Sequence, residues 1–309
     1  MMKSVESAES GVLRVELSAG ARRNRYAASA SGRASQNSAS LCHGALRVTL
    51  TLALLLSLCV LASCGRQSAA FNVAGSTSVQ PYVEILAEDY ERAYPGAVID
   101  VQGGGSSAGI QAVESGTAEI GMSSRHLKED ESHLWSIEIA KDGLAIIVNP
   151  RNPVGNLSLE QLEGIYEARY TNWSELGGLD ARIHVISREE GSGTRSAFEE
   201  MVMDGTRIDP RSIVQDSNGA VRQLVSDDPN SIGFISLGLV DIGEKPVKAI
   251  DINRFAPTRE NVASGDYPLF RSFLLVALVE PTGNAMHFIE YIRSPEGRRV
   301  LAAEGLIPE

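Results

Sequence analysis

Four short segments of this chain concentrate side chains that bind small anions. They read Ser76-Thr77-Ser78, Gly105-Ser106-Ser107, Ser123-Ser124-Arg125, and Ser192-Gly193-Thr194 with Arg188 four residues upstream. An oxyanion that leaves water needs several hydrogen-bond donors and little competing negative charge. Hydroxyl and backbone N–H groups supply donors, small residues permit close backbone approach, and arginine adds a charged, bidentate contact. The pattern predicts a binding site for a tetrahedral oxyanion.

The elements predicted around these segments bring them together. Residues 71–74, 98–101, 118–122 and 182–187 read as strands, and each ends at one of the four segments. Apolar residues at helical spacing follow the first segment, on a face formed by Val83, Leu86, Ala87, Tyr90 and Tyr94. Repeated strand–loop–helix units predict an α/β fold with a mainly parallel sheet. Ligands of such sheets bind beyond the carboxyl ends of the strands, beside helix N-termini.

Other segments predict how the rest of the chain is organised. Residues 144–148 and 273–279 are apolar strands that we expect to cross between two halves of the molecule. Ser158 and Gln161 form a capping-box pattern at the start of a helix. Residues 285–303 read as helical around Ser294-Pro295.

The motifs resemble the phosphate-binding proteins of phosphate-specific ABC transporters. The resemblance covers nearly all of 71–309 and is carried by GSTSVQPYVEILAEDYERAYPGAVIDVQGGGSSAGI, IGMSSR, YTNWSELGG and SREEGSGTRSAFEE. It implies a two-lobed, hinged type II periplasmic-binding-protein fold that delivers inorganic phosphate to the permease subunits of an ABC transporter. The lobes are expected at 71–145 plus 271–309 and at 146–270, with phosphate in the cleft between them and a monomeric protein.

The resemblance also implies roles for particular residues. Thr77 and Ser78 bind through hydroxyl and backbone N–H groups, Ser106 matches the serine of the second loop, and Arg188 is the ion-pairing arginine. Ser192, Gly193 and Thr194 form a cradle at the start of a helix. The predicted phosphate-binding residues are therefore Ser76, Thr77, Ser78, Ser106, Ser107, Ser124, Arg125, Arg188, Ser192, Gly193 and Thr194.

Ser124 departs from the pattern of the family. Well-studied relatives place an aspartate at this position, where it accepts the proton that phosphate carries. Sulfate has no such proton, so a carboxylate rejects it. A serine hydroxyl does not repel sulfate, and Arg125 beside it adds positive charge. We therefore expect phosphate to bind best but with a narrower margin over sulfate, and a proton acceptor at Asp216 or a backbone carbonyl.

The segment before the predicted fold reads as an export signal. The run LTLALLLSLCVL at 50–61 follows Arg47 and is too short to span a bilayer. Leu61-Ala62-Ser63-Cys64 resembles the lipobox of bacterial lipoproteins, which implies removal of 1–63, a lipid on Cys64 and a tether at 64–70. Residues 1–44 form a Ser/Ala/Arg-rich extension, so either the basic region is unusually long or the true start lies nearer Arg47. We expect an exported, membrane-anchored protein, periplasmic or on the outer cell surface.

Charge and cysteine content exclude other classes of partner. The chain has a net charge of −11, and because residues 1–63 carry +4, the remainder carries −15. A polyanionic nucleic acid is therefore not an expected partner. The three cysteines are Cys42, Cys59 and Cys64, and the histidines are scattered, so we predict no metal and no cofactor.

Two rival functions remain open at the level of sequence. Gly105-Ser106-Ser107-Ala108-Gly109 matches the G-x-S-x-G loop of serine esterases, with Asp251 or Asp266 and then His287 following in hydrolase order. Hydrolysis leaves the other three donor segments unexplained, so we predict a protein that is not an enzyme. A membrane-tethered adhesion module is the other rival. Within the binding-protein interpretation, another tetrahedral oxyanion such as sulfate is the alternative ligand.

Overall fold

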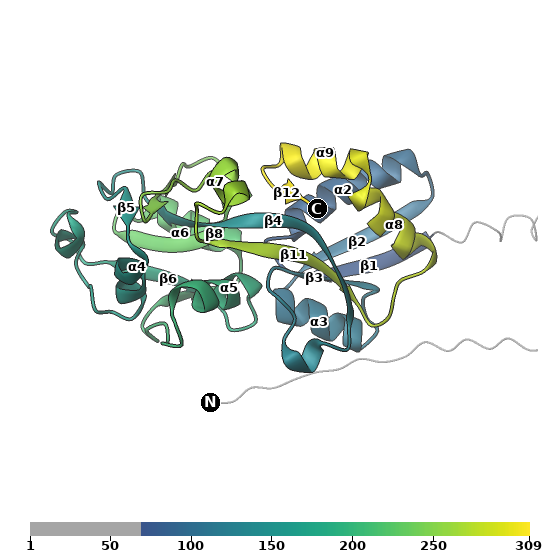
Figure 1. Ribbon diagram of the computed structural model, residues 1–309, viewed down its shortest axis with the longest axis horizontal. Helices are drawn as coiled ribbons and strands as arrows, with labels where there is room; N and C mark the ends of the chain where they lie inside the picture. The colour runs from purple at the N-terminus through teal and green to yellow at the C-terminus, as the bar shows by residue number, and fades with distance from the viewer. Residues whose placement is uncertain (1–68) are drawn as a thin grey trace, which may run out of the picture. The chain divides into compact units, whose positions relative to one another are not determined.

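The computed structural model describes residues 69–309, which lie in one compact unit spanning Arg66–Glu309 (Figure 1). The predictions for the export signal, Cys64 and most of the tether fall outside the described residues. No helix between Ala69 and Glu309 is long and apolar enough to cross a membrane.

The first part of the described chain builds three parallel strands. The elements are β1 (Ala69–Gly75), α2 (Gln80–Ala93), β2 (Ala97–Gly103), α3 (Ser106–Glu114) and β3 (Ile120–Ser123). β1 lies between β2 and β3 and is parallel to both. The predicted apolar face of α2 is buried except at Tyr94, which is 54% exposed. Tyr94 follows the last helical residue, where Pro95-Gly96 turns the chain away from the helix axis.

A second part forms another set of parallel strands. Its main elements are α4 (Leu159–Tyr166), β6 (His184–Arg188), α5 (Gly193–Val202), β7 (Ile213–Gln215), α6 (Asn218–Asp227) and β8 (Ser231–Ser236). β6 is parallel to β7 and to β8. The predicted capping box at Ser158 and Gln161 is present at the start of α4. Smaller elements complete this part: β5 (Asn156–Leu157), β9 (Lys248–Ala249), β10 (Asp251–Ile252) and α7 (Arg259–Ser264).

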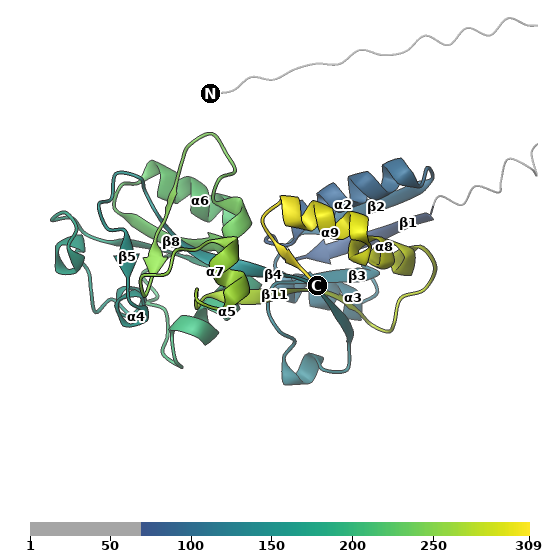
Figure 2. The ribbon, with the colours of Figure 1, turned by 45° about the horizontal axis from the view of Figure 1, so that its top comes forward.

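Two long antiparallel strands connect these parts. β4 (Trp135–Val148) pairs with β11 (Phe270–Ala277) over most of its length and with β8 at its end. β11 also pairs with β3, so the sheet order is β2-β1-β3-β11-β4-β8-β6-β7. Both views show β4 and β11 running side by side between the two sets of helices (Figures 1 and 2). Four of the seven strand pairs along this order are parallel, and the three antiparallel pairs all involve the connecting strands β4 and β11.

We call β1–β3 with α2, α3 and the last two helices group one, and β6–β8 with α4–α7 group two. The helices predicted around Ser294-Pro295 are α8 (Gly283–Arg293) and α9 (Pro295–Ala303), which meet at Ser294, the N-cap of α9. They return to group one, where Phe288 of α8 packs 5.4 Å from the ring of Tyr90 on α2. β12 (Ile307–Pro308) ends the chain beside β4.

Helices cover both faces of the sheet, so its strands are apolar on both sides. In β11, Phe273 and Leu275 face the core beneath α2 and α8, whereas Leu274 and Val276 face α3. This alternation is the period of two expected of a strand. In group two the rings of Phe198 and Phe234 stack with centroids 4.3 Å apart. Burial on both faces fixes the register and therefore the level at which each strand ends.

Candidate anion-binding site

Strand register brings the predicted donor segments to one edge of the sheet. Gly75, the last residue of β1, is opposite Gly103 of β2 and opposite Met122 of β3. The carbonyl of Gly75 accepts hydrogen bonds from the amides of Gly104 and Gly105, at 2.8 and 2.9 Å. Only glycine suits position 75, because its φ is +141° and a Cβ would collide with the Met122 carbonyl. The three segments of group one therefore begin at the same level.

Three buried serines from these segments form one hydroxyl cluster. Ser76 Oγ donates to Ser124 Oγ at 2.8 Å, and the Ser124 amide donates to Ser106 Oγ at 3.1 Å. Ser106 is the first residue of α3, and all three side chains are at most 2% exposed. The cluster places hydroxyl donors beside a helix N-terminus, which favours negative charge.

The N-terminus of α5 packs directly against this cluster from group two. A Cβ at Gly193 would overlap Ser106 Oγ and lie 2.7 Å from Ser124 Oγ, so glycine is required for this close approach. Ser192 caps the helix by accepting from the Arg195 amide, and Thr194 Oγ1 lies 2.8 Å from Ser78 Oγ. A backbone hydrogen bond of 3.1 Å from the amide of Ser107 to the carbonyl of Gly191 also links the two groups.

Arg188 is the buried cation at the end of β6. Its Nε and Nη2 each donate to the Glu189 carboxylate at 2.9 Å, and Nη2 also donates to the Asp216 carbonyl at 3.0 Å and to Thr77 Oγ1 at 3.3 Å. Its side chain is 1% exposed, and Nη1 has no hydrogen-bond partner within residues 69–309. Because an unpaired buried donor is costly, the geometry leaves this guanidinium one N–H group for an anion.

Arg125 is also buried, but its charge is already paired. Its Nη1 and Nη2 donate to the two carboxylate oxygens of Glu131 at 2.6 and 2.8 Å. Although burial raises the pKa of Glu131, hydrogen bonds from Arg125 and the Lys128 amide bring it below the ordinary value, so the carboxylate stays ionised. Nη2 lies 3.4 Å from Ser107 Oγ, which accepts from it. Arg125 therefore orders the second segment, and its positive charge is balanced locally.

Two buried polar residues that received no binding role from the sequence join the site. Asn218, the first residue of α6, donates from Nδ2 to Ser78 Oγ at 2.8 Å and to Thr77 Oγ1 at 3.3 Å. Arg271 of β11 donates from Nη2 to Ser78 Oγ at 3.0 Å. The signal for Arg271 was a charged side chain next to a strand predicted to be apolar. Asn218 lies in the segment 216–219, whose sequence reads as a helix cap that could also line the cleft.

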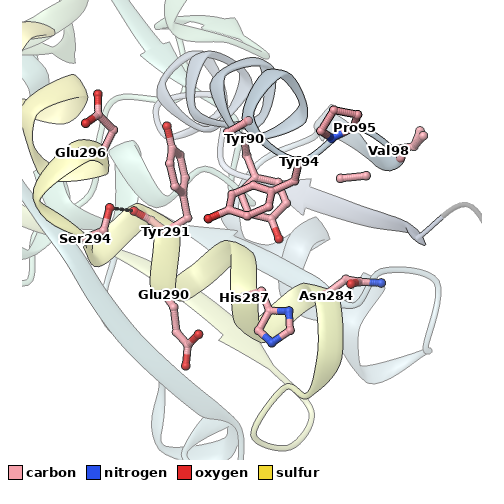
Figure 3. Close-up of a pocket in the computed structure, with 13 residues that line it drawn as sticks. Tyr90, Tyr94, Pro95, Val98, Asn284, His287, Glu290, Tyr291, Ser294 and Glu296 are labelled. Carbon is pink, nitrogen blue, oxygen red and sulfur yellow. Dashed lines mark hydrogen bonds between the residues drawn. The ribbon is translucent and has the colours of Figure 1, made fainter.

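The residues of the rival esterase triad are dispersed. Ser107 lies beyond the carboxyl end of β2, and the described contact of its hydroxyl is with Arg125. His287 lines a pocket of about 1160 Å³ with Tyr90, Tyr94 and Val98 (Figure 3). This pocket adjoins the amino end of β2, and a strand of that length spans roughly 20 Å. His287 therefore does not reach Ser107.

A family model described as a PBP superfamily domain matches residues 62–296. The phosphate-binding protein PstS of Bacillus subtilis is 32% identical over 248 residues, which cover 79% of this chain and 82% of that protein. The chain belongs to the PstS family of phosphate-binding proteins.

Solved structures of PstS-like proteins agree with this assignment. A putative phosphate ABC transporter substrate-binding protein from Clostridium perfringens, solved with bound phosphate, is 40% identical, with a TM-score of 0.74. The alignment covers 78% of this chain and 99% of that one. An ABC-type phosphate transport receptor from Vibrio cholerae is 38% identical, with a TM-score of 0.64 over 78% of this chain and 100% of that one. The predicted type II periplasmic-binding-protein fold is confirmed.

Three carboxylates close to the PstS-type segments are paired with arginines. Glu131 pairs with Arg125, Glu189 with Arg188, and Asp142 of β4 with Arg271. Burial raises the pKa of Asp142 to about 6, against the opposing effects of Arg271 and Ser236. Folding therefore disfavours the ionised form of this carboxyl group.

This buried carboxyl group gives a pH dependence of stability. Between its unfolded pKa and about pH 6 the folded protein holds a proton on Asp142 that the unfolded chain releases, so stability from this group falls as pH rises. We expect the free energy of unfolding of the wild type, minus that of Asp142→Asn, to decrease by about 2 kcal/mol from pH 4 to pH 7. Urea titrations in phosphate-free buffer measure it. A difference that is constant or rises with pH contradicts this prediction.

Proposed function

We propose that this protein captures inorganic phosphate between groups one and two and delivers it to an ABC importer. The observation that carries the proposal is the convergence, at one buried place, of hydroxyls from group one with Arg188 and the N-terminus of α5 from group two. The bound phosphate in the Clostridium perfringens relative supports the choice of anion. Binding needs donors alone, so the proposed role includes no covalent chemistry.

The proposed lobes are 71–145 plus 271–309 and 146–270, with β4 and β11 as the hinge. Ala145 of β4 is opposite Ile235 of β8, and Phe270 of β11 is opposite Gly143 of β4, so both proposed boundaries fall on connecting strands. Donors from both lobes then surround the anion, and closure excludes water. A dry site strengthens each charged hydrogen bond to the ligand.

Isothermal titration of the purified protein tests the function directly. We expect one phosphate per chain and weaker binding of sulfate. We expect no turnover of p-nitrophenyl acetate, because His287 does not reach Ser107 and the described contact of the Ser107 hydroxyl is with Arg125. Heat evolved on phosphate addition should saturate at a single equivalent. Ester hydrolysis that disappears in Ser107→Ala, with no phosphate binding, would establish the esterase instead. Absence of both activities would favour an adhesion module.

The predicted export and anchoring complete the proposed role. We propose that residues 1–63 are removed, that Cys64 carries the lipid, and that the monomer meets its permease at the membrane. The support is the run 50–61 followed by Leu61-Ala62-Ser63-Cys64. Mass spectrometry of membrane-extracted protein should find Cys64 as a lipid-bearing N-terminal residue. An N-terminus upstream of Cys64, or an unmodified Cys64, contradicts this prediction. The variant Cys64→Ala should carry no lipid, and it should either be released from the membrane or keep residues 1–63 as an unprocessed precursor.

A further inference from the structure

Three buried arginines near the donor segments share one arrangement. Each is paired with a carboxylate, and each keeps one buried nitrogen without a hydrogen-bond partner in the described part of the chain. The nitrogens are Arg125 Nε, Arg188 Nη1 and Arg271 Nη1. Arg188 and Arg125 were predicted from the sequence, whereas Arg271 lies on a connecting strand. Its unpaired nitrogen needs an explanation, because an orphaned buried donor destabilises a fold.

Asp142 fixes the orientation of Arg271. The two residues are opposite each other on β11 and β4, and Asp142 Oδ2 accepts from Nε at 3.2 Å and from Nη2 at 3.0 Å. Ser236 Oγ donates to the other carboxylate oxygen at 2.8 Å, and the guanidinium lies 5.4 Å from the Phe273 ring centroid. With Nε and Nη2 occupied, Nη1 is the group left for another partner.

The surroundings of Arg271 indicate what that partner is. Nη2 reaches Ser78 Oγ, which in turn lies 2.8 Å from both Thr194 Oγ1 and Asn218 Nδ2. Burial is the largest effect on the pKa of Arg271 and lowers it, Asp142 raises it, and the charge of the neighbouring Arg188 lowers it further. Two buried cations near each other repel, and an anion between them removes the repulsion.

We propose that Arg271 is a second cationic residue of the anion site, whose Nη1 donates to the bound anion while Asp142 holds the guanidinium in place. The proposal rests on the proposed function and deepens it. Arg271 lies on a strand that pairs with both β3 and β4. The anion is thus held by each group and by the strand that joins them.

The test compares Arg271→Gln, Arg271→Lys and the wild type by phosphate titration at pH 8. Loss of one buried partner of a charge pair should weaken binding by at least about 30-fold in Arg271→Gln. Arg271→Lys should recover part of the loss, because it keeps the charge but not the forked geometry. Arg222→Gln is the matched control. Arg222 is also buried, but its Nε donates to the Val240 carbonyl, so affinity should not change.

Folding is checked separately, because removal of Arg271 leaves Asp142 buried without its cation. If Arg271→Gln does not fold, Asp142→Asn combined with Arg271→Gln removes both charges, which often preserves stability. The same loss of affinity is expected in the double variant. A folded variant with affinity within about threefold of wild type overturns the inference. In that case, if the wild type binds phosphate and Arg188→Ala does not, the proposed function stands and only the role of Arg271 is refuted. A wild type that does not bind phosphate refutes the proposed function itself.

Discussion

Replacing Arg188 with alanine should weaken phosphate binding by about 2–5 kcal/mol, the cost of removing one partner of a buried charged pair. The guanidinium offers a buried Nη1 that has no other partner among residues 69–309, and its side chain is held by Glu189 and the Asp216 carbonyl. Isothermal titration measures the change. The variant should fold, because Glu189 is 31% exposed and water can solvate its carboxylate once the arginine is gone.

Two further variants separate contact from charge. Arg188→Ala combined with Glu189→Gln removes the carboxylate that would otherwise repel the anion, so any loss that remains reports the missing arginine contact. Arg169→Ala is the control, because Arg169 also pairs with carboxylates of group two, Glu163 and Glu167, but at the surface. Its affinity should match wild type. Wild-type affinity in both Arg188 variants would place Arg188 outside the site.

Replacing Ser124 with aspartate should widen discrimination against sulfate by about 100-fold or more, since like charges in contact cost several kcal/mol. Ser124 is fully buried and lies within the hydroxyl cluster of Ser76 and Ser106. A carboxylate there accepts the proton of phosphate but repels sulfate. The wild type has a hydroxyl in place of a carboxylate at position 124, and Glu131, Glu189 and Asp142 are paired with arginines, so it should prefer phosphate by a smaller margin.

Competitive titration with phosphate and sulfate at pH 6 and pH 8 measures the selectivity. Sulfate keeps its charge across this range while phosphate changes protonation, so the two pH values separate charge from proton donation. Ser124→Asn is the matched control, because it has the size of aspartate without the charge and should leave the ratio of affinities nearly unchanged. If the wild type already excludes sulfate in millimolar excess and Ser124→Asp alters nothing, selectivity arises elsewhere.

Local sequence determined where the donors lie along the chain. Ser192 before Gly193 and Thr194, or Ser158 with Gln161, are signals that a few residues encode, because a helix cap involves only its own first turn. The family motifs are equally local. For that reason the strand–loop–helix units, and the place of Arg188 at the end of a strand, were predictable without coordinates.

Tertiary structure alone decided which distant residues meet those donors and in what electrostatic state. Ser78 contacts Asn218 and Arg271 across 140 and 193 residues of chain, which no local pattern encodes. The sequence predicted two crossing strands but not their antiparallel pairing, and it is the pairing of β11 with β4 that brings Arg271 there. Whether an arginine is free or neutralised depends on its neighbours in space. Arg125 is paired with Glu131, six residues further along, because the intervening chain turns back. The sequence gives the charge of each side chain but does not show which partner neutralises it.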